Sequence, residues 1–251
     1  MAIPISVQLY SLRDAAAKDF TGVLKSVAQI GYPYVEFAGL HNKSAKEVRK
    51  LIDDIGLKPS SAHVALFDPA ARAKVEDEAR ALGYTHLVSG FGKDDFASED
   101  KIRAAADKVN AAVNYFGPKG FTVSLHNHEW EFSAPNKGDL LLELAPKAGP
   151  QLDVYWIKFG GADPVDVIKR YGKRTHLVHI KDGPANSKNR DLPMTAVGQG
   201  QIDIPGVVRA AEYAGVEFLI VELDRCGTDM LQAVADSYNY LTSRSLAKGN
   251  R

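Results

Sequence analysis

The sequence is poor in cysteine, in net charge and in long apolar runs, and each lack excludes a class of protein. Cys226 is the one cysteine among 251 residues, which excludes an intramolecular disulfide framework and a cysteine-based zinc site. Lysine plus arginine number 31, as do aspartate plus glutamate, so we expect no basic face for nucleic acid. No stretch approaches the roughly 20 apolar residues that cross a membrane.

The first residues, MAIPISVQLYSLRD, lack the basic region and long apolar core of a signal peptide. They continue at once into a strand-like pattern. Together with the single cysteine, this favours a reducing, cytoplasmic location.

Short apolar runs rich in β-branched and aromatic residues alternate with longer segments of helical spacing. DFTGVLKSVAQIG (19–31) and SAKEVRKLIDDIG (44–56) are examples of the helical segments, each closed by a glycine where a C-terminal cap belongs. The strand-like runs are ISVQLY (5–10), YVEFA (34–38), PSSAHV (59–64), HLVSG (86–90), FTVSLHNH (121–128), PQLDVYW (150–156), HLVHIKD (176–182) and FLIVELD (218–224).

Eight strand and helix units in a chain of this length predict a closed (β/α)8 TIM barrel with parallel strands. A doubly wound sheet is less suitable, because no glycine-rich phosphate motif follows the first run. We therefore expect one barrel domain over residues 1–251. Segment 183–204 is long, irregular and rich in Gly, Pro and Asn, and we expect it to be an active-site loop.

Titratable residues collect where the predicted strands end, and this is the edge at which barrel enzymes hold their active sites. His86 and His176 begin their runs and His41 lies in a loop, so we expect structural roles for these three. The residues at strand ends are His63, His126, His128, His179, Lys181, Glu222 and Asp224.

Glu222, embedded in LIVELD, is the most informative of these residues. A buried carboxylate is costly unless it is paired, hydrogen-bonded or bound to a metal. A salt bridge to Lys181 or Arg225 would satisfy it. Imidazoles and carboxylates from several strands would equally suit a divalent ion such as manganese, iron, cobalt or zinc.

The segments SVQLYSLRD, YVEFAGL, LHNHEWEF, LDVYW, HIKD and VELD resemble the xylose isomerase-like TIM barrel superfamily. This is the sugar phosphate isomerase/epimerase group, which also includes endonuclease IV. The resemblance implies one divalent ion, commonly Mn²⁺, with Mg²⁺, Co²⁺, Fe²⁺ and Zn²⁺ as alternatives. It also implies that Asp153, His179 and Glu222 are three of the ligands.

The fourth ligand of that family comes from the fifth strand, where epimerases usually place a glutamate. This chain has His126 at that point and resembles a branch with an HNH strand end. The prediction assigns Glu131 as the ligand, with His126 and His128 as rivals for metal binding or for proton transfer. Glu129 is expected to be solvated.

The resemblance implies a sugar isomerase or epimerase that removes an α-proton from a ketose or keto-sugar through a metal-stabilised enediolate. We expect Glu222 to be both ligand and base. Its partner would be a small-molecule sugar, with no nucleic acid and no membrane, and the sequence leaves a homo-oligomer open. The expected substrate-binding residues are His63, Trp156, Lys181, Glu36 and Trp130.

Three other functions are compatible with the sequence. A lyase of the inosose-dehydratase or 3-keto-glycoside type would use the same chemistry to expel water or an aglycone, and an imidazole acid at HNH favours it. An enzyme like endonuclease IV would need more metal ligands and a cationic surface. A non-catalytic sugar-binding barrel would not need the retained Asp153, His179 and Glu222.

Overall fold

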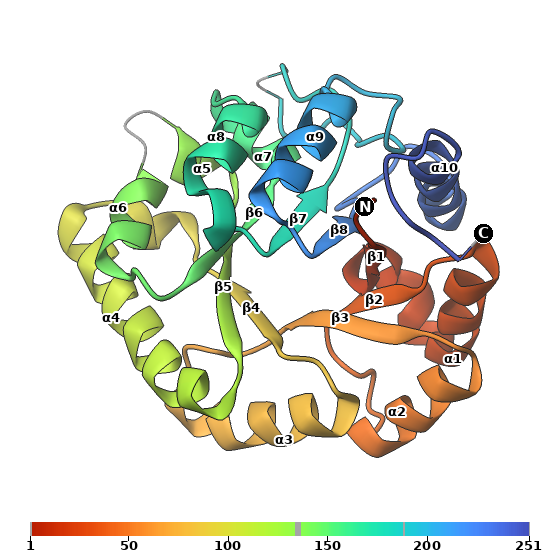
Figure 1. Cartoon of the computed structure of the whole chain (residues 1–251), viewed down its shortest axis with the longest axis horizontal. Helices are drawn as coiled ribbons and strands as arrows, with labels where there is room; N and C mark the ends of the chain where they lie inside the picture. Colours follow the sequence, from red (N-terminus) through yellow and green to blue (C-terminus); the bar gives the residue numbers. More distant parts are fainter. Residues whose placement is uncertain (1, 134–136, 188, 251) are drawn as a thin grey trace.

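The computed structural model describes residues 2–133, 137–187 and 189–250, and its strands close into a parallel barrel surrounded by helices (Figure 1). Each strand pairs with its neighbours in sequence, and β1 pairs with β8. This confirms the predicted (β/α)8 barrel. The strands are β1 (Ile5–Gln8), β2 (Tyr34–Phe37), β3 (Lys58–His63), β4 (His86–Gly90), β5 (Thr122–His126), β6 (Gly149–Asp153), β7 (Leu177–Ile180) and β8 (Phe218–Val221).

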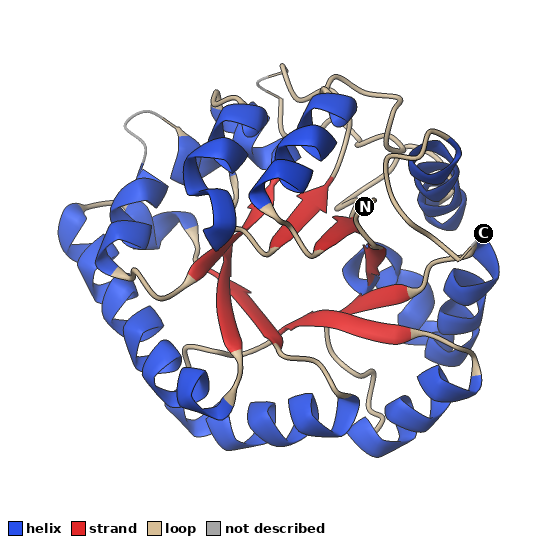
Figure 2. Cartoon of the chain, in the orientation of Figure 1, coloured by secondary structure: helices blue, strands red, loops and turns tan. Residues whose placement is uncertain are grey.

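Helices form the outer layer around these strands, as Figure 2 shows. None of those in the described part of the chain combines the length and the apolar character that a bilayer crossing requires. They are α1 (Arg13–Ile30), α2 (Ala45–Asp54), α3 (Arg72–Leu82), α4 (Glu99–Phe116), α5 (Glu129–Phe132), α6 (Lys137–Leu144), α7 (Val154–Gly160), α8 (Pro164–Tyr171), α9 (Ile204–Ala214) and α10 (Met230–Ser243). Short 3-10 turns are η1 (Leu9–Leu12), η2 (Pro69–Ala71), η3 (Lys93–Phe96), η4 (Gly117–Lys119) and η5 (Gly172–Arg174).

Several strands end earlier than the apolar runs predicted. The run 150–156 is the clearest case, because β6 stops at Asp153 and the next residues begin α7. Oδ1 of Asp153 accepts a hydrogen bond from the backbone N–H of Trp156 at 3.0 Å, which caps this helix. Trp156 therefore belongs to a helix and not to a strand.

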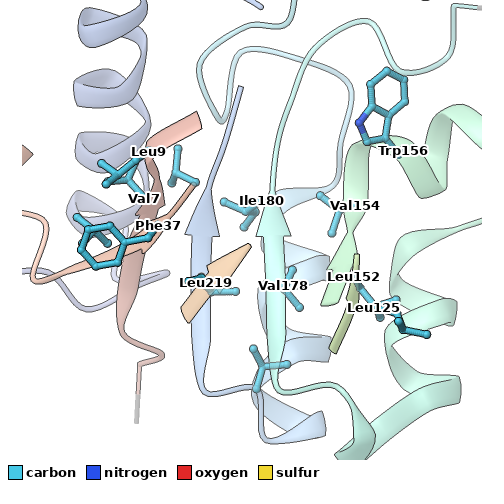
Figure 3. Packing of buried hydrophobic residues seen from close by; sticks show 14 of the residues in the cluster. Val7, Leu9, Phe37, Leu125, Leu152, Val154, Trp156, Val178, Ile180 and Leu219 are labelled. Atoms are coloured by element: carbon cyan, nitrogen blue, oxygen red, sulfur yellow. The ribbon is translucent and has the colours of Figure 1, made fainter. Parts of the chain in front are cut away.

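The core has two parts. The larger part packs the outward faces of the strands against the helices, and Figure 3 shows Phe37, Leu152 and Val178 within it. A separate cluster joins Val88 of β4 to Leu177 of β7 and Ile220 of β8. Because β4 pairs with neither β7 nor β8, this contact crosses the inside of the barrel and fills it.

At the amino-terminal end of the barrel, Glu217 joins two histidines. Its carboxylate lies 2.8 Å from Nδ1 of His176 and 3.2 Å from Nε2 of His86. The Thr122 hydroxyl lies 2.7 Å from the other nitrogen of His86. Burial lowers the pKa of His86, although Glu217 opposes the shift. Both imidazoles thus have structural partners, in agreement with the expectation from sequence.

The long segment that follows β7 is tied back to the barrel by one carboxylate. Asp182 is buried, and its Oδ1 accepts from the backbone N–H groups of Gly183 at 2.8 Å and Ile202 at 3.1 Å. Its Oδ2 accepts from Gly198 at 2.9 Å and Gly200 at 3.0 Å. These bonds fold the described part of 183–204 over the carboxyl end of the barrel. Residue 188 of the predicted loop lies outside the described residues.

Replacing Asp182 with alanine is expected to free this segment while leaving the barrel folded. Each lost charge-assisted hydrogen bond contributes about 1.5 kcal/mol or more, which is about tenfold in an opening equilibrium. Amide hydrogen exchange at Gly198, Gly200 and Ile202 should therefore accelerate at least about tenfold. Asp229→Ala, which removes an exposed cap of α10, is the control and should leave those amides unchanged. Equal protection in both variants would contradict the anchoring role.

Candidate metal and active site

A cavity of about 830 Å³ opens over the carboxyl ends of the strands. Gln8 at the end of β1, Gly90 at the end of β4 and Arg190 from the long loop are among the residues that line it. Predicted site residues on its wall are His63, His126, His128, Trp130, Trp156, Glu222 and Asp224. The strand ends and the segments that follow them thus bring together seven side chains from distant parts of the sequence.

Four buried residues form a compact donor cluster at the base of this cavity: His126, Asp153, His179 and Glu222. One ligand atom from each lies within 4.8 Å of the others. His126 ends β5, Asp153 ends β6, and the register places Asp153 beside His179 of β7. Glu222 is the first residue after β8. Adjacent parallel strands therefore deliver the cluster from one edge.

His179 is held between two carboxylates. Its Nδ1 lies 2.6 Å from Oε2 of Glu222, and its Nε2 lies 2.5 Å from Oε1 of Glu36. Burial alone would lower the pKa of His179, but Glu36 and Glu222 together raise it to about 10. Burial would likewise raise the pKa of Glu222, yet Lys181 and His179 hold it well below its usual value. The imidazole is thus charged and the carboxylate ionised at neutral pH.

Lys181 is fully buried beside three carboxylates. Its ammonium lies 2.9 Å from Asp153, 2.8 Å from Glu222 and 2.9 Å from Asp224. Burial would lower the pKa of Lys181, but these carboxylates raise it well above its usual value. Lys181 does not line the cavity, whereas its partners Glu222 and Asp224 do. The substrate contact that the sequence predicts for Lys181 would therefore be indirect, through these two carboxylates.

A buried oxygen of Asp153 tests whether a cation fits the cluster. Its Oδ2 is buried and accepts no hydrogen bond of good geometry from a described residue, although the Lys181 ammonium is 2.9 Å away. The same oxygen lies 4.0 Å from Nε2 of His126. Burial raises the pKa of Asp153 to about 6 against the opposing effect of Lys181. An oxygen in this condition is poorly satisfied by the side chains alone.

The charges and spacings of this region fit a divalent cation. Glu36, Asp153, Glu222 and Asp224 face the Lys181 ammonium and the His179 imidazolium, which leaves two negative charges uncompensated. Metal bonds to imidazole and carboxylate are about 2.0–2.2 Å, so opposite ligands can be about 4.4 Å apart. Donors within 4.8 Å need to move by only a few tenths of an ångström to share an ion.

Beneath the cluster lies a layer of four buried side chains, Gln8, Glu36, Ser61 and Gln151, which we call the polar floor. Glu36 is its centre and accepts from Gln8 Nε2 at 2.7 Å, Ser61 Oγ at 2.6 Å and Gln151 Nε2 at 2.6 Å. Burial would raise the pKa of Glu36, but His179 and His63 hold it well below its usual value. The sequence predicts that Glu36 binds substrate, whereas the structure places it under the cluster and not on the cavity wall.

Glu131 is not brought into the cluster. It lies three residues after His128, which precedes α5, and its Oε2 accepts the backbone N–H of His128 at 3.0 Å. Its carboxylate therefore turns back to cap its own short helix, and burial raises its pKa well above the usual value. His126, the rival from the sequence, occupies the position on β5 beside Asp153.

His128 faces the cavity and stacks on Trp130, with ring centroids 4.4 Å apart. Its Nδ1 is buried and has no hydrogen-bond partner among the described residues. Burial, reinforced by Lys181, lowers the pKa of His128 to about 4. A neutral imidazole thus lies on the wall, with its ring centroid 5.1 Å from that of His126.

The rim of the cavity combines tryptophan with arginine. Trp156 Nε1 donates to Asp224 at 3.1 Å, and the Arg190 guanidinium lies 4.7 Å from the Trp156 ring centroid and 5.4 Å from that of Trp130. Arg190 also lies 3.6 Å from Glu129. The sequence predicts that Glu129 is solvated, but the structure shows it half-buried. Both tryptophans therefore line the cavity, and each ring lies near Arg190 of the long loop.

Sequence reasoning missed the floor residues Gln8 and Gln151 and the rim residue Arg190. Gln151 had a usable signal, because it is a polar residue in a predicted strand at the same parity as a predicted site residue. Gln8 had none, because its strand contains no predicted site residue. Gln151 lies two positions before Asp153 on β6. No spacing rule could place Arg190, since it comes from an irregular loop.

The model of the xylose isomerase-like TIM barrel family matches residues 24–243 of the chain. Among characterised proteins, inosose dehydratase of Geobacillus kaustophilus is 23% identical over an alignment of 256 positions. That alignment covers 87% of this chain and 82% of the dehydratase.

Two solved structures show the same architecture. A sugar phosphate isomerase/epimerase from Parabacteroides distasonis has a TM-score of 0.79 and 24% identity, with 99% of this chain and 96% of that chain covered. The IOLI protein, solved with a bound zinc atom, has a TM-score of 0.73 and 15% identity, with coverages of 97% and 98%. At these identities the likeness concerns the fold.

Proposed function

Because this chain belongs to the xylose isomerase-like TIM barrel family, we propose that it is a metal-dependent sugar isomerase or epimerase. Its substrate is a ketose or keto-sugar, and its reaction begins with removal of a proton from the carbon beside the carbonyl. The observation that carries the proposal is the buried His126, Asp153, His179 and Glu222 cluster at the base of an open cavity.

In this proposal His126, Asp153, His179 and Glu222 hold one divalent ion. When bound, such an ion supplies a Lewis acid that stabilises the enediolate charge. Mn²⁺ is the proposed occupant, with Mg²⁺, Co²⁺, Fe²⁺ and Zn²⁺ as alternatives for the same mixture of imidazole and carboxylate. The zinc-bound relative and the donor set support a divalent ion without choosing among these.

Glu222 is the proposed base. The contacts to His179 and Lys181 both fall on its Oε2, and no described residue forms a hydrogen bond or ion pair with Oε1. The residue lines the cavity, so Oε1 is the oxygen available to a substrate proton. The pKa of Glu222 lies well below the usual value, so its carboxylate is ionised at neutral pH.

His128 is the proposed second proton carrier. It lies on the cavity wall as a neutral imidazole, held in place by its stack on Trp130. It can accept a proton and return it to a different carbon or to the other face of the sugar. Trp156 and Trp130 provide apolar walls for the sugar, and His63 can bond a hydroxyl or carbonyl oxygen.

Elimination is the second candidate, and one observation favours it. Glu222 and Asp224 are the carboxylates on the described cavity wall, whereas three imidazoles, His63, His126 and His128, also line it. Of the two cluster carboxylates, only Glu222 lies on the described cavity wall. The described residues therefore do not place one cluster carboxylate on each face of the sugar. An imidazole that has accepted the proton removed from the substrate can deliver it to a departing hydroxyl or aglycone, and the matched inosose dehydratase performs a reaction of this type.

Proton exchange in D₂O tests the function directly. The metal-loaded protein is incubated with ketoses, inososes and 3-keto-glycosides, and products are identified by mass spectrometry and NMR. We expect deuterium at the carbon beside the carbonyl of at least one substrate, together with an isomer or epimer. Loss of water or an aglycone would select elimination instead. Absence of exchange with every class would overturn the proposed chemistry.

A further inference from the structure

The polar floor has a fixed hydrogen-bond polarity that begins at Glu36. The carboxylate of Glu36 can only accept, so its partner Gln151 must present its NH₂ group, and Nε2 of Gln151 indeed lies 2.6 Å away. The oxygen of Gln151 is thereby turned to the opposite side. That oxygen lies 3.1 Å from Nδ1 of His126 and 2.9 Å from Nε2 of His63.

Gln151 in turn decides which nitrogen of His126 carries the proton. An amide oxygen can only accept, so Nδ1 of His126 must be the protonated nitrogen. Nε2 is then left with a free lone pair, and this is the nitrogen that lies 4.0 Å from Oδ2 of Asp153. The lone pair of His126 therefore faces the donor cluster.

The same carboxylate acts on His179 without an intermediary. Oε1 of Glu36 lies 2.5 Å from Nε2 of His179 and keeps a proton on that nitrogen. Nδ1 is the nitrogen toward Glu222, so it is the nitrogen that can release its proton and bind an ion while Nε2 stays protonated. One buried carboxylate thus orients two imidazoles that lie on β5 and β7.

We infer that Glu36 and Gln151 are positioning residues that select Nε2 of His126 and Nδ1 of His179 as ligand atoms through one hydrogen-bond chain across the barrel. The inference deepens the proposed function, because it rests on the same metal cluster. Neither residue touches the cavity wall, so neither contacts substrate. Outer partners of this kind typically change metal affinity by 10–100-fold.

Glu36→Gln tests the polarity of the chain. The new NH₂ group must either face the NH₂ of Gln151 or face Nε2 of His179. In the first case Gln151 turns over and forces the proton of His126 onto Nε2. In the second case the proton of His179 is kept on Nδ1. Either way one imidazole presents N–H to the cluster, and we expect metal affinity to fall by about 10–100-fold.

The double variant Glu36→Gln with Gln151→Glu exchanges acid and amide and separates polarity from packing. The new carboxylate on β6 accepts from His126 and His63, and the new amide donates to it while accepting from His179. We expect Mn²⁺ and Co²⁺ affinity, measured by titration calorimetry, to recover to within about threefold of the original. Glu217→Gln, which alters a carboxylate between two imidazoles at the opposite end, is the matched control and should bind metal normally.

Imidazole ¹⁵N chemical shifts of the metal-free proteins provide the second measurement. His126 should carry its proton on Nδ1 in the original and double variant. In Glu36→Gln either that proton should move to Nε2 of His126, or the His179 imidazolium should lose the proton on its Nε2. Unchanged protonation of both imidazoles in that variant, or a folded double variant no better than the single one, would overturn the inference. If the original chain binds no metal, the proposed function fails, while the tautomer measurement still decides the inference.

Discussion

Glu222→Gln is expected to lower turnover by about two to four orders of magnitude, the usual contribution of a positioned base. Glutamine keeps the shape of the side chain and an oxygen for the cluster, but it lacks the basic lone pair that Oε1 presents to the cavity. Metal and substrate binding should be retained in weakened form, because His126, Asp153 and His179 remain. The loss should therefore fall on kcat more than on KM.

Solvent-deuterium exchange into bound substrate is the decisive measurement for this variant. Glu217→Gln, the same substitution at the opposite end of the barrel, is the control and should exchange at the original rate. Exchange near the original rate in Glu222→Gln would exclude Glu222 as the base. The role would then pass to His128, which faces the same cavity.

His179→Ala is expected to abolish stoichiometric metal binding. The change removes one of the four donors. It also removes the imidazole between Glu36 and Glu222, so two buried carboxylates lose their shared partner. Removing one member of a buried ion pair typically costs about 3–5 kcal/mol, so the barrel should be less stable yet folded. His179→Gln, which can still donate its NH₂ group to one of the two carboxylates, is a second variant for the case in which His179→Ala does not fold.

Metal content after chelation and reloading, measured by mass spectrometry, checks this prediction alongside circular dichroism. Glu131→Gln is the comparison variant, because Glu131 is the ligand that the sequence favours and lies outside the cluster. We expect it to keep its metal. Normal metal content in folded His179→Ala would refute the site, whereas loss of metal in Glu131→Gln would return the fourth ligand to Glu131.

The barrel could be predicted because its signal is local, whereas Asp153, His179 and Glu222 were expected together as ligands from the resemblance to a family. Asp153, His179 and Glu222 are polar residues at or just beyond the ends of apolar strands, and parallel strands bring those ends together. Strand limits were less accurate, since caps such as that of Asp153 on α7 depend on one side-chain hydrogen bond. A pattern of hydrophobic residues does not report such a bond.

The choice between His126 and Glu131 could not be settled from sequence for a similar reason. It depends on where the chain turns from β5 into α5, and that turn sends the Glu131 carboxylate back to the backbone of His128. Glu36 illustrates a different difficulty. Its depth depends on cross-barrel contacts to residues more than 100 positions away, such as His179 at a separation of 143.

Because Asp182 holds both ends of the long loop, that segment can be replaced as a unit. Gly183 and Ile202 both donate to the same Oδ1, so the segment leaves and rejoins the barrel at one point. Doubling the length of a closed loop costs only about 0.6 kcal/mol of closure entropy. Insertions, or a transplanted loop from a relative, should therefore replace Arg190 at the rim without disturbing the four residues of the donor cluster, so the rim of the cavity can be redesigned separately from its base.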